Sequence, residues 1–373
     1  MSSVSAGSCR KLSMGRSTLM VMVMVMVMVM ASCGSNPSTA DKGRAVTGTP
    51  QHLSTSATGK STTTVPARTG VREPGGLGTP LPVPRALLPF NALAAPGAGA
   101  WHAGGRIVAG VPAVYETTLV PPGGSQPAGI AWMDTHLLTA LLYSGSKSPG
   151  GGPFRHTAPI APGEAASLVA AFNGGFLMDA AGGGYVTEGR VVVPLVTGAA
   201  SLVIRADGTV DIGAWGSDVS MTPDVVSIRQ NLIPLVEGGR PTAQAARPDW
   251  LSWGNTCGST SCAHSVPSVE MQWRSGLGIT ADGALVYAVG TSLTPLQLAQ
   301  LLVHAGAVRG MELDINPSWT VLVTFDPIIP GGLAAPGNGT RLLADTMQGP
   351  ATFFDPGWAR DFVTMSARPA PSG

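Results

Sequence analysis

The sequence predicts an α+β fold with mixed or antiparallel sheets and few helices, in a single Gly- and Pro-rich domain. Two observations favour it. From Trp101 onward, short apolar runs are broken by Gly and Pro, which is typical of many short strands. Only residues 295–305 repeat apolar side chains at a convincing helical spacing. The chain has 373 residues, including 50 Gly and 32 Pro, and this length allows one large loop-rich domain.

Residues 1–33 have the pattern of an export signal. Three basic residues precede the apolar run Leu19–Ala31, whose length of about 13 residues suits a signal peptide and is short for a membrane span. The run ends in Ala31-Ser32-Cys33, and small residues directly before a Cys resemble a bacterial lipobox. We therefore expect a lipid on Cys33 and an extracytoplasmic protein anchored to the bacterial cell membrane. The alternative is an ordinary secretory signal with an incidental Cys and a secreted product.

Residues 34–100 are rich in Ser, Thr, Pro, Gly and Ala and show no sustained periodicity. Such a segment buries too little apolar surface to order itself, so it is predicted to be a disordered tether before a domain at 101–370. Arg85–Leu93 is more apolar, and we expect it to dock on the domain as a first strand.

Beyond the signal, the chain carries two cysteines, Cys257 and Cys262, in a polar loop. Their spacing suits a small disulfide in an oxidising compartment. The alternative, a metal site, lacks ligands, because His264 is the only nearby candidate. The six histidines are dispersed, so neither a metal nor a cofactor is expected.

Several apolar runs in the first part of the domain are expected to be strands: Leu137–Tyr143, Ser167–Phe172, Ser201–Ile204, Val210–Trp215, Val225–Ile228 and Ile233–Val236. Asp207-Gly208 is a hairpin signal between two of them. Pro162–Ala166 is expected to form a single helical turn. Near the end of the chain, Ile328–Asn338 is expected to be a loop, and Ala351–Phe354 with Phe362–Met365 to close the sheet.

The stretch from Arg274 to Trp319 has the clearest local signals. An apolar run turns at Asp282-Gly283, which suits a tight hairpin. Thr294, Pro295 and Gln297 then form a helix start, with Thr as N-cap and Gln three residues later. After Gly306 the chain re-enters a strand, Val308–Leu313.

Two carboxylates, Glu312 and Asp314, stand at the end of that strand. Because strand side chains alternate, both acids project from one face if the strand persists through Asp314. We place the chemistry there.

Four segments, in order along residues 101–366, resemble the phosphodiester glycosidase family. They are Ala171-Phe172-Asn173-Gly174-Gly175-Phe176, Arg229-Gln230-Asn231-Leu232, Arg274-Ser275-Gly276-Leu277-Gly278-Ile279 with Asp282-Gly283, and the 294–306 helix leading to Leu313-Asp314. The resemblance implies an α+β fold with a surface cavity lined by these motifs. The chain departs from the family after Asp314, where Ile315-Asn316-Pro317-Ser318-Trp319 replaces a Gly-rich turn.

The resemblance implies hydrolysis of a glycosidic bond to a phosphodiester on an extracytoplasmic glycan or glycolipid. Asp314 is expected to be the catalytic carboxylate, with Glu312 assisting, because carboxylates stabilise charge at an anomeric carbon. Arginine binds phosphate oxygens well, so Arg274 and Arg229 are the candidates for phosphate. The remaining candidates for substrate binding come from the same motifs: Asn173, Gly174, Gly175, Asn231 and Asn316.

Each assignment has a structural alternative. A single Arg often makes an ion pair, and an Asp after a strand often caps a turn. Two other functions also remain open, a glycan-binding module without turnover and a phosphodiesterase that cleaves the P–O bond. A net charge of +1 with 12% charged residues gives no sign of a nucleic-acid partner.

Overall fold

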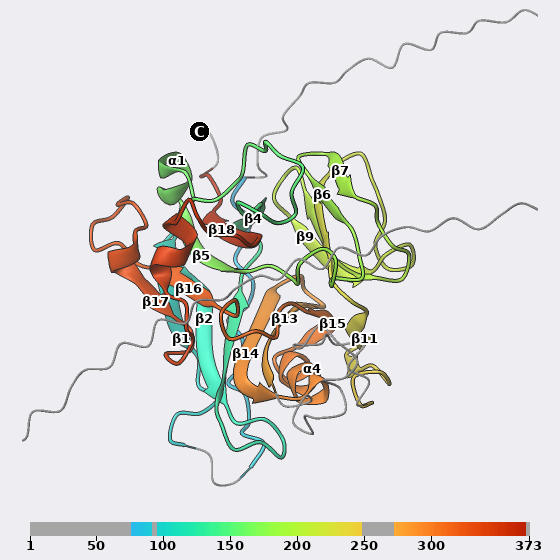
Figure 1. The fold of residues 1–373 in the computed structure, drawn as a ribbon. Coiled ribbons are helices and arrows are strands. Elements are labelled where there is room, and N and C mark those ends of the chain that lie inside the picture. Colours follow the sequence, from blue (N-terminus) through green and yellow to red (C-terminus); the bar gives the residue numbers. More distant parts are fainter. Residues whose placement is uncertain (1–75, 92–94, 248–271, 371–373) are drawn as a thin grey trace, which may run out of the picture. The chain divides into compact units, whose positions relative to one another are not determined.

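The computed structural model describes residues 76–91, 95–247 and 272–370, all within the compact unit Arg68–Gly373 (Figure 1). The predicted signal peptide, the lipid on Cys33, the first part of the tether and the Cys257–Cys262 pair lie outside these described residues. In the part of the chain that is described, no helix is long and apolar enough to cross a membrane.

Three antiparallel sheets form most of the fold in the part of the chain that the structure describes. The 8-stranded sheet contains, in spatial order, β1 (His102–Val108), β2 (Val111–Leu119), β3 (Ala128–Met133), β14 (Leu285–Leu293), β13 (Gln272–Thr280), β15 (Ala307–Glu312), β11 (Pro234–Glu237) and β12 (Arg240–Pro241). One 5-stranded sheet contains β7 (Arg190–Val193), β6 (Tyr185–Thr187), β10 (Val225–Gln230), β8 (Ala200–Arg205) and β9 (Val210–Ala214). The other contains β17 (Gly339–Arg341), β16 (Leu322–Phe325), β5 (Leu168–Asn173), β18 (Phe362–Ala367) and β4 (Leu138–Tyr143).

Helices are few among the described residues. They are α1 (Pro162–Ala165), α4 (Pro295–His304) and the 3-10 turns η1 (Pro336–Asn338) and η2 (Pro350–Phe354). The prediction of many antiparallel strands with few helices is therefore confirmed.

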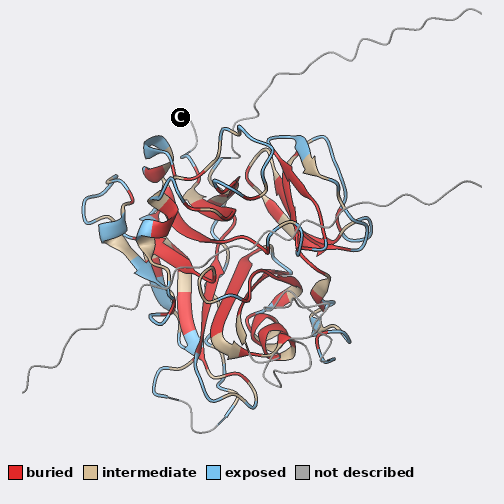
Figure 2. Cartoon of the chain, in the orientation of Figure 1, coloured by how far each residue is buried: buried red, intermediate tan, exposed pale blue. Residues whose placement is uncertain are grey.

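The 8-stranded sheet buries both of its faces. On one face, Leu298, Leu301 and Leu302 of α4 pack in a cluster with β14 and β11. On the other face, side chains such as Leu277 and Tyr287 join a core shared with the two smaller sheets. Figure 2 shows the central strands as largely buried, which explains why they read as apolar runs.

The hairpin and helix signals between β13 and β15 are correct. β13 and β14 pair antiparallel, and Gly283 takes a φ of 91° in the turn, a value that favours glycine. The Thr294 hydroxyl accepts a hydrogen bond from the Gln297 N–H at 3.1 Å, and the Gln297 side chain accepts one from the Thr294 N–H at 2.9 Å. This reciprocal cap fixes where α4 begins.

Phe362–Met365 is a strand, as expected, and lies within β18, between β5 and β4. Two other expectations about this part of the fold are wrong. Ala351–Phe354 lies in the 3-10 turn η2 instead of a strand. The strand that carries Glu312 ends at that residue, so Asp314 lies in the following loop. The two acids therefore do not share a strand face.

The described part of the segment before Trp101 is not a strand, yet it contacts the domain. The Leu81 N–H donates to Asp134 Oδ2 at 2.8 Å, and the Leu87 N–H donates to the Gly99 carbonyl at 2.9 Å. Leu81, Leu87 and Phe90 pack against the cluster under α4. These contacts lie upstream of the boundary that the sequence suggests at residue 101.

Candidate functional site

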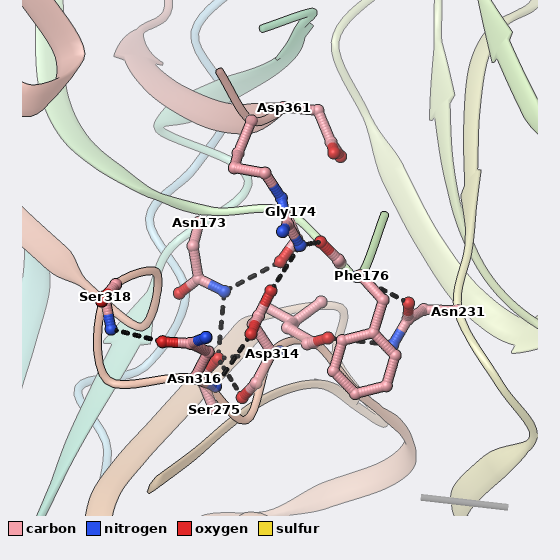
Figure 3. A network of polar contacts seen from close by, with 12 residues as sticks. Asn173, Gly174, Phe176, Asn231, Ser275, Asp314, Asn316, Ser318 and Asp361 are labelled. Atoms are coloured by element: carbon pink, nitrogen blue, oxygen red, sulfur yellow. Dashed lines mark hydrogen bonds and ion pairs between the residues drawn. The ribbon is translucent and has the colours of Figure 1, made fainter. Parts of the chain in front are cut away.

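The predicted site residues meet where strands of all three sheets end. Asn173 ends β5, Asn231 follows β10, and Glu312 ends β15. Arg274 lies near the start of β13, and the turn before β18 brings Arg360 and Asp361 to the same place. Figure 3 shows much of the resulting polar network.

Asn173 lies at the centre of this network and uses its whole amide. Its Nδ2 donates to the Gly174 carbonyl at 2.8 Å and to Ser275 Oγ at 3.0 Å (Figure 3). Its Oδ1 accepts from the Tyr287 hydroxyl at 2.7 Å and from the Val321 N–H at 3.1 Å. Because both amide hydrogens and both lone pairs are used, Asn173 joins β5, β13 and β14 and has no capacity left for a ligand.

The two glycines make room for neighbouring side chains. A Cβ on Gly174 would lie 2.1 Å from Asp361 Oδ2, and one on Gly175 would lie 2.5 Å from Asn231 Oδ1. The glycines therefore allow close packing around an ion pair and an amide, whereas the sequence suggested that they bring the main chain close to a ligand.

Arg229 forms a closed ion pair with Asp361, and both side chains are fully buried. Its Nε donates to Asp361 Oδ2 at 2.7 Å, its Nη1 donates to the Gln230 carbonyl at 2.6 Å, and its Nη2 donates to the Phe176 carbonyl. All three guanidinium nitrogens are thus engaged within the protein. This geometry gives Arg229 a structural role, which is the ion pair that the sequence left open as the alternative to phosphate binding.

Asn231 is also engaged within the protein. Its Nδ2 donates to the carbonyls of Glu312 and Leu313, both at 2.9 Å, and its Oδ1 accepts from the Phe176 N–H at 2.9 Å. The side chain therefore fixes the path of the chain between the two carboxylates.

Arg274 and Glu312 form a second buried ion pair. Arg274 Nη1 lies 2.6 Å from Glu312 Oε1, and Arg274 Nε donates to the Leu293 carbonyl at 2.8 Å. Burial raises the pKa of Glu312 to about 7, and the positive charge of Arg274 offsets part of that effect. Glu312 Oε2 makes no hydrogen bond with the described residues, so half of this carboxylate is unsatisfied.

Asp314 pairs with an arginine that the sequence analysis did not select. Arg360 Nη2 lies 2.7 Å from Asp314 Oδ2 and also donates to the Gly175 carbonyl at 2.8 Å. The other carboxylate oxygen, Asp314 Oδ1, accepts from the Asn316 N–H at 2.9 Å. Burial raises the pKa of Asp314 to about 6, against the lowering effect of Arg360 and of the backbone N–H groups.

The loop after Asp314 carries the exposed part of the site. Asn316 is exposed, and its Oδ1 accepts from the Ser318 N–H at 2.8 Å. Trp319 is half-buried, with the Arg360 guanidinium 5.0 Å from its ring centre. Asp314 therefore caps a turn, as the structural alternative proposed, and also holds a cation beside an aromatic ring.

The structure brings the predicted catalytic and substrate-binding residues together, but it gives them different partners from those expected. Sequence reasoning missed Arg360, Asp361, Ser275 and Tyr287. Arg360 and Asp361 carried one usable signal, two adjacent opposite charges directly before an apolar strand. Among the described residues, no group of His, Cys, Asp and Glu is arranged to hold a metal ion.

Comparisons with known proteins point to one family. Residues 166–345 match the model of the phosphodiester glycosidase family, which confirms the family resemblance of the sequence. No curated protein sequence matches the chain significantly.

Solved structures that resemble the chain include two distant ones. The first is the catalytic domain of zebrafish N-acetylglucosamine-1-phosphodiester α-N-acetylglucosaminidase, auto-inhibited by its pro-peptide, with 16% identity and a TM-score of 0.44 over 72% of this chain and 88% of that one. The second is a hypothetical protein from Synechocystis, with 10% identity and a TM-score of 0.41 over 70% of this chain and 63% of that one.

Proposed function

We propose, from the phosphodiester glycosidase match of residues 166–345, that the chain hydrolyses the bond between a sugar and a phosphodiester. The proposal rests on the position and the contacts of Asp314. Its carboxylate lies within the matched segment, directly before the exposed Asn316 loop, and an arginine holds it at 2.7 Å.

In this proposal Asp314 acts on the anomeric carbon. The bond from that carbon to the phosphate oxygen breaks, and the electron pair stays on that oxygen, so the group leaves as a phosphate monoester anion. The Asp314 carboxylate stabilises the positive charge that develops on the sugar, either by electrostatic contact or by forming a bond. Water then supplies the hydroxyl at the anomeric carbon and loses its proton to solvent. Because the leaving group is a stable anion, the reaction has little need of a general acid.

Glu312 supports Asp314 in this scheme instead of contacting the substrate. It is fully buried against Arg274, and its backbone carbonyl is held by Asn231. The pair therefore fixes the end of β15, from which the Asp314 loop departs. We place the substrate in a surface cavity over this loop, with Asn316 as the exposed polar contact.

We further propose that the protein is exported and anchored through a lipid on Cys33, so that its substrate is an extracytoplasmic glycan or glycolipid. The lipobox-like Ala31-Ser32-Cys33 supports this proposal. Metabolic labelling with a radioactive fatty acid tests it. Label in the native protein and none in Cys33→Ala is expected, whereas an unlabelled membrane-free protein would indicate an ordinary secretory signal.

A glycan-binding module without turnover is the second candidate. One observation favours it: both carboxylates are committed to buried arginines, as in a purely structural arrangement. A binding module predicts that Asp314→Asn keeps its affinity for glycans and that no product forms with any diester.

The test is turnover of a panel of sugar-1-phosphodiesters by the full-length protein, purified in detergent, beside Asp314→Asn. We expect release of free sugar by the native protein and a loss of roughly a thousandfold or more in kcat/KM for the variant. No release from the whole panel, with measurable glycan binding, would favour the binding module. Hydrolysis in ¹⁸O-labelled water identifies the bond: label in the sugar supports C–O cleavage, and label in the phosphate supports a phosphodiesterase.

A further inference from the structure

Arg360 has hydrogen-bonding capacity that the fold does not use. A guanidinium carries five N–H groups, and the two on Nη2 point to Asp314 Oδ2 at 2.7 Å and the Gly175 carbonyl at 2.8 Å. No acceptor among the described residues receives a hydrogen bond from Nε or Nη1, and Nε is buried. Three N–H groups of a nearly buried cation, only 7% exposed, are thus left for another partner.

Leaving these N–H groups without acceptors costs free energy unless a ligand supplies the acceptors. A buried donor without an acceptor loses its hydration and gains nothing, and the loss is larger for a charged group. Arg229, at the same junction, donates from all three of its nitrogens to protein oxygens. Arg360 therefore stands out because it lies in the same polar cluster and yet remains open.

The surroundings of Arg360 fit an anionic ligand. The central carbon of its guanidinium lies over the Trp319 ring, 5.0 Å from the ring centre, where a cation is attracted to the ring face. Trp319 in turn packs edge-on against Trp358, with ring centres 5.0 Å apart. The guanidinium thus contacts an aromatic ring and a carboxylate and still has unused donors. Phosphate oxygens are the acceptors that such donors bind best.

We infer that Arg360, and not Arg229 or Arg274, is the residue that binds the phosphate group of the substrate. This inference rests on the proposed function for the identity of the anion. It replaces the assignment suggested by the sequence, since Arg229 is closed by Asp361 and Arg274 is buried against Glu312.

The arrangement also explains how a phosphate would be aligned with Asp314. The same guanidinium holds the carboxylate through Nη2 and the phosphate through its remaining donors. The anomeric carbon, one bond from the phosphate oxygen, is thereby brought next to Asp314. Charge on the leaving phosphate increases as the bond breaks, so the contact with Arg360 strengthens toward the transition state.

The test is a binding titration that does not depend on turnover. Dimethyl phosphate is added to the full-length protein in detergent and followed by ³¹P NMR. Arg360→Gln removes the cation. Arg360→Lys keeps a charge for Asp314 and the Gly175 carbonyl but leaves only one of its three donors for phosphate, so it separates binding from folding. Arg309→Gln is the matched control, since Arg309 also pairs with one carboxylate, Asp211 at 2.6 Å, away from the site.

We expect saturable binding by the native protein and by Arg309→Gln. Affinity should fall roughly tenfold in Arg360→Lys and about a hundredfold in Arg360→Gln, as expected for losing charge-assisted hydrogen bonds. Undiminished affinity in Arg360→Lys, or no saturable binding by the native protein, overturns the inference.

Diester hydrolysis by the same preparations separates the two proposals. Turnover together with dimethyl phosphate binding that ignores Arg360 overturns the inference alone and leaves the proposed function standing. Binding that depends on Arg360, without any turnover, supports the inference and overturns the proposed hydrolysis.

Discussion

Arg360 and Asp361 are neighbours in the chain, yet they enter two very different ion pairs. Asp361 pairs with Arg229 of β10 in a contact whose two side chains are fully buried, and all three nitrogens of Arg229 are used. Arg360 pairs with Asp314 at the same distance, 2.7 Å, but two of its nitrogens have no acceptor among the described residues. One pair is complete, and the other leaves donors unpaired.

The two ion pairs therefore differ in role, although Arg360 and Asp361 are adjacent: one pair stabilises the fold, and the other is available for chemistry. A buried ion pair repays the cost of dehydration only when its remaining hydrogen-bonding groups are satisfied. In the Arg229–Asp361 pair every guanidinium nitrogen and both carboxylate oxygens have a partner, so its role is to join the sheets. The Asp314–Arg360 pair does not meet that condition, and unsatisfied charged groups are characteristic of places where a ligand completes the arrangement.

The largest expected effect comes from breaking the complete pair. Asp361→Ala strands the Arg229 guanidinium without a counter-charge in the interior, which should lower the free energy of unfolding by about 3–5 kcal/mol. Chemical denaturation measures it. The control is Asp211→Ala, because the Asp211–Arg309 pair is partly exposed and should contribute about 1 kcal/mol or less. Equal losses in the two variants would contradict the claim that burial sets the difference.

The next effect tests the close packing around that pair. A methyl group on Gly174 would lie 2.1 Å from Asp361 Oδ2, so Gly174→Ala must displace the carboxylate from Arg229. We expect a loss of about 2–3 kcal/mol in unfolding free energy, as for overpacked cores. Gly349→Ala is the control, because nothing lies within 4 Å of its added Cβ, and it should change stability by less than about 0.5 kcal/mol. A Gly174→Ala variant as stable as this control would show that the carboxylate can move freely.

The sequence predicted most of the strands that carry the site, because local rules decide them. The Asp282-Gly283 turn and the Thr294 cap depend on neighbouring residues, and both are in place. Strands such as β1–β3 and β16 were missed. Their apolar residues are interrupted by Gly, Thr and polar residues, and long-range pairing decides their state more than local pattern does.

The partners within the site could not be predicted in the same way. Arg229 and Asp361 are 132 positions apart, and only the fold brings them together. The sequence selected Asp314 and Glu312 as the candidate carboxylates, but it could not tell which arginine pairs with which carboxylate. Nor could it show that Arg229 is fully engaged while Arg360 has donors unused, because that depends on counting acceptors in space.

A third prediction concerns the Glu312–Arg274 pair, which has one unsatisfied carboxylate oxygen. Burial raises the pKa of Glu312 to about 7 from its ordinary 4.5, so the folded protein keeps a proton that the unfolded chain releases. The contribution of the bound proton on Glu312 to the free energy of unfolding is thus complete below pH 4.5 and is lost as the pH rises through about 7. Glu312→Gln cannot lose this proton.

The unfolding free energy of Glu312→Gln, relative to the native protein, should therefore rise by roughly 1–3 kcal/mol between pH 4.5 and 7.5. Denaturation at a series of pH values measures it. Gly349→Ala, which alters no titratable group and has nothing within 4 Å of its added Cβ, serves as the control and should track the native protein over this range. A relative stability of Glu312→Gln that falls with rising pH would mean that the Arg274 charge, and not burial, dominates at Glu312.

The smallest expected effect concerns the Asp314–Arg360 pair and is measured as the pH dependence of kcat/KM. Burial raises the pKa of Asp314 to about 6, and Arg360 acts against that rise. If the ionised carboxylate is the working form, kcat/KM should fall about tenfold for each pH step below 6. Arg360→Gln removes the opposing charge, so its acid limb should move to higher pH and cost an additional factor of roughly five at pH 6. Arg360→Lys keeps the charge, so its limb should remain near that of the native protein even though its phosphate binding is weaker. If the acid limb lies at the same pH in the native protein, Arg360→Gln and Arg360→Lys, then Arg360 does not set the ionisation of Asp314. The unused donors of Arg360 would in that case serve only to bind the substrate.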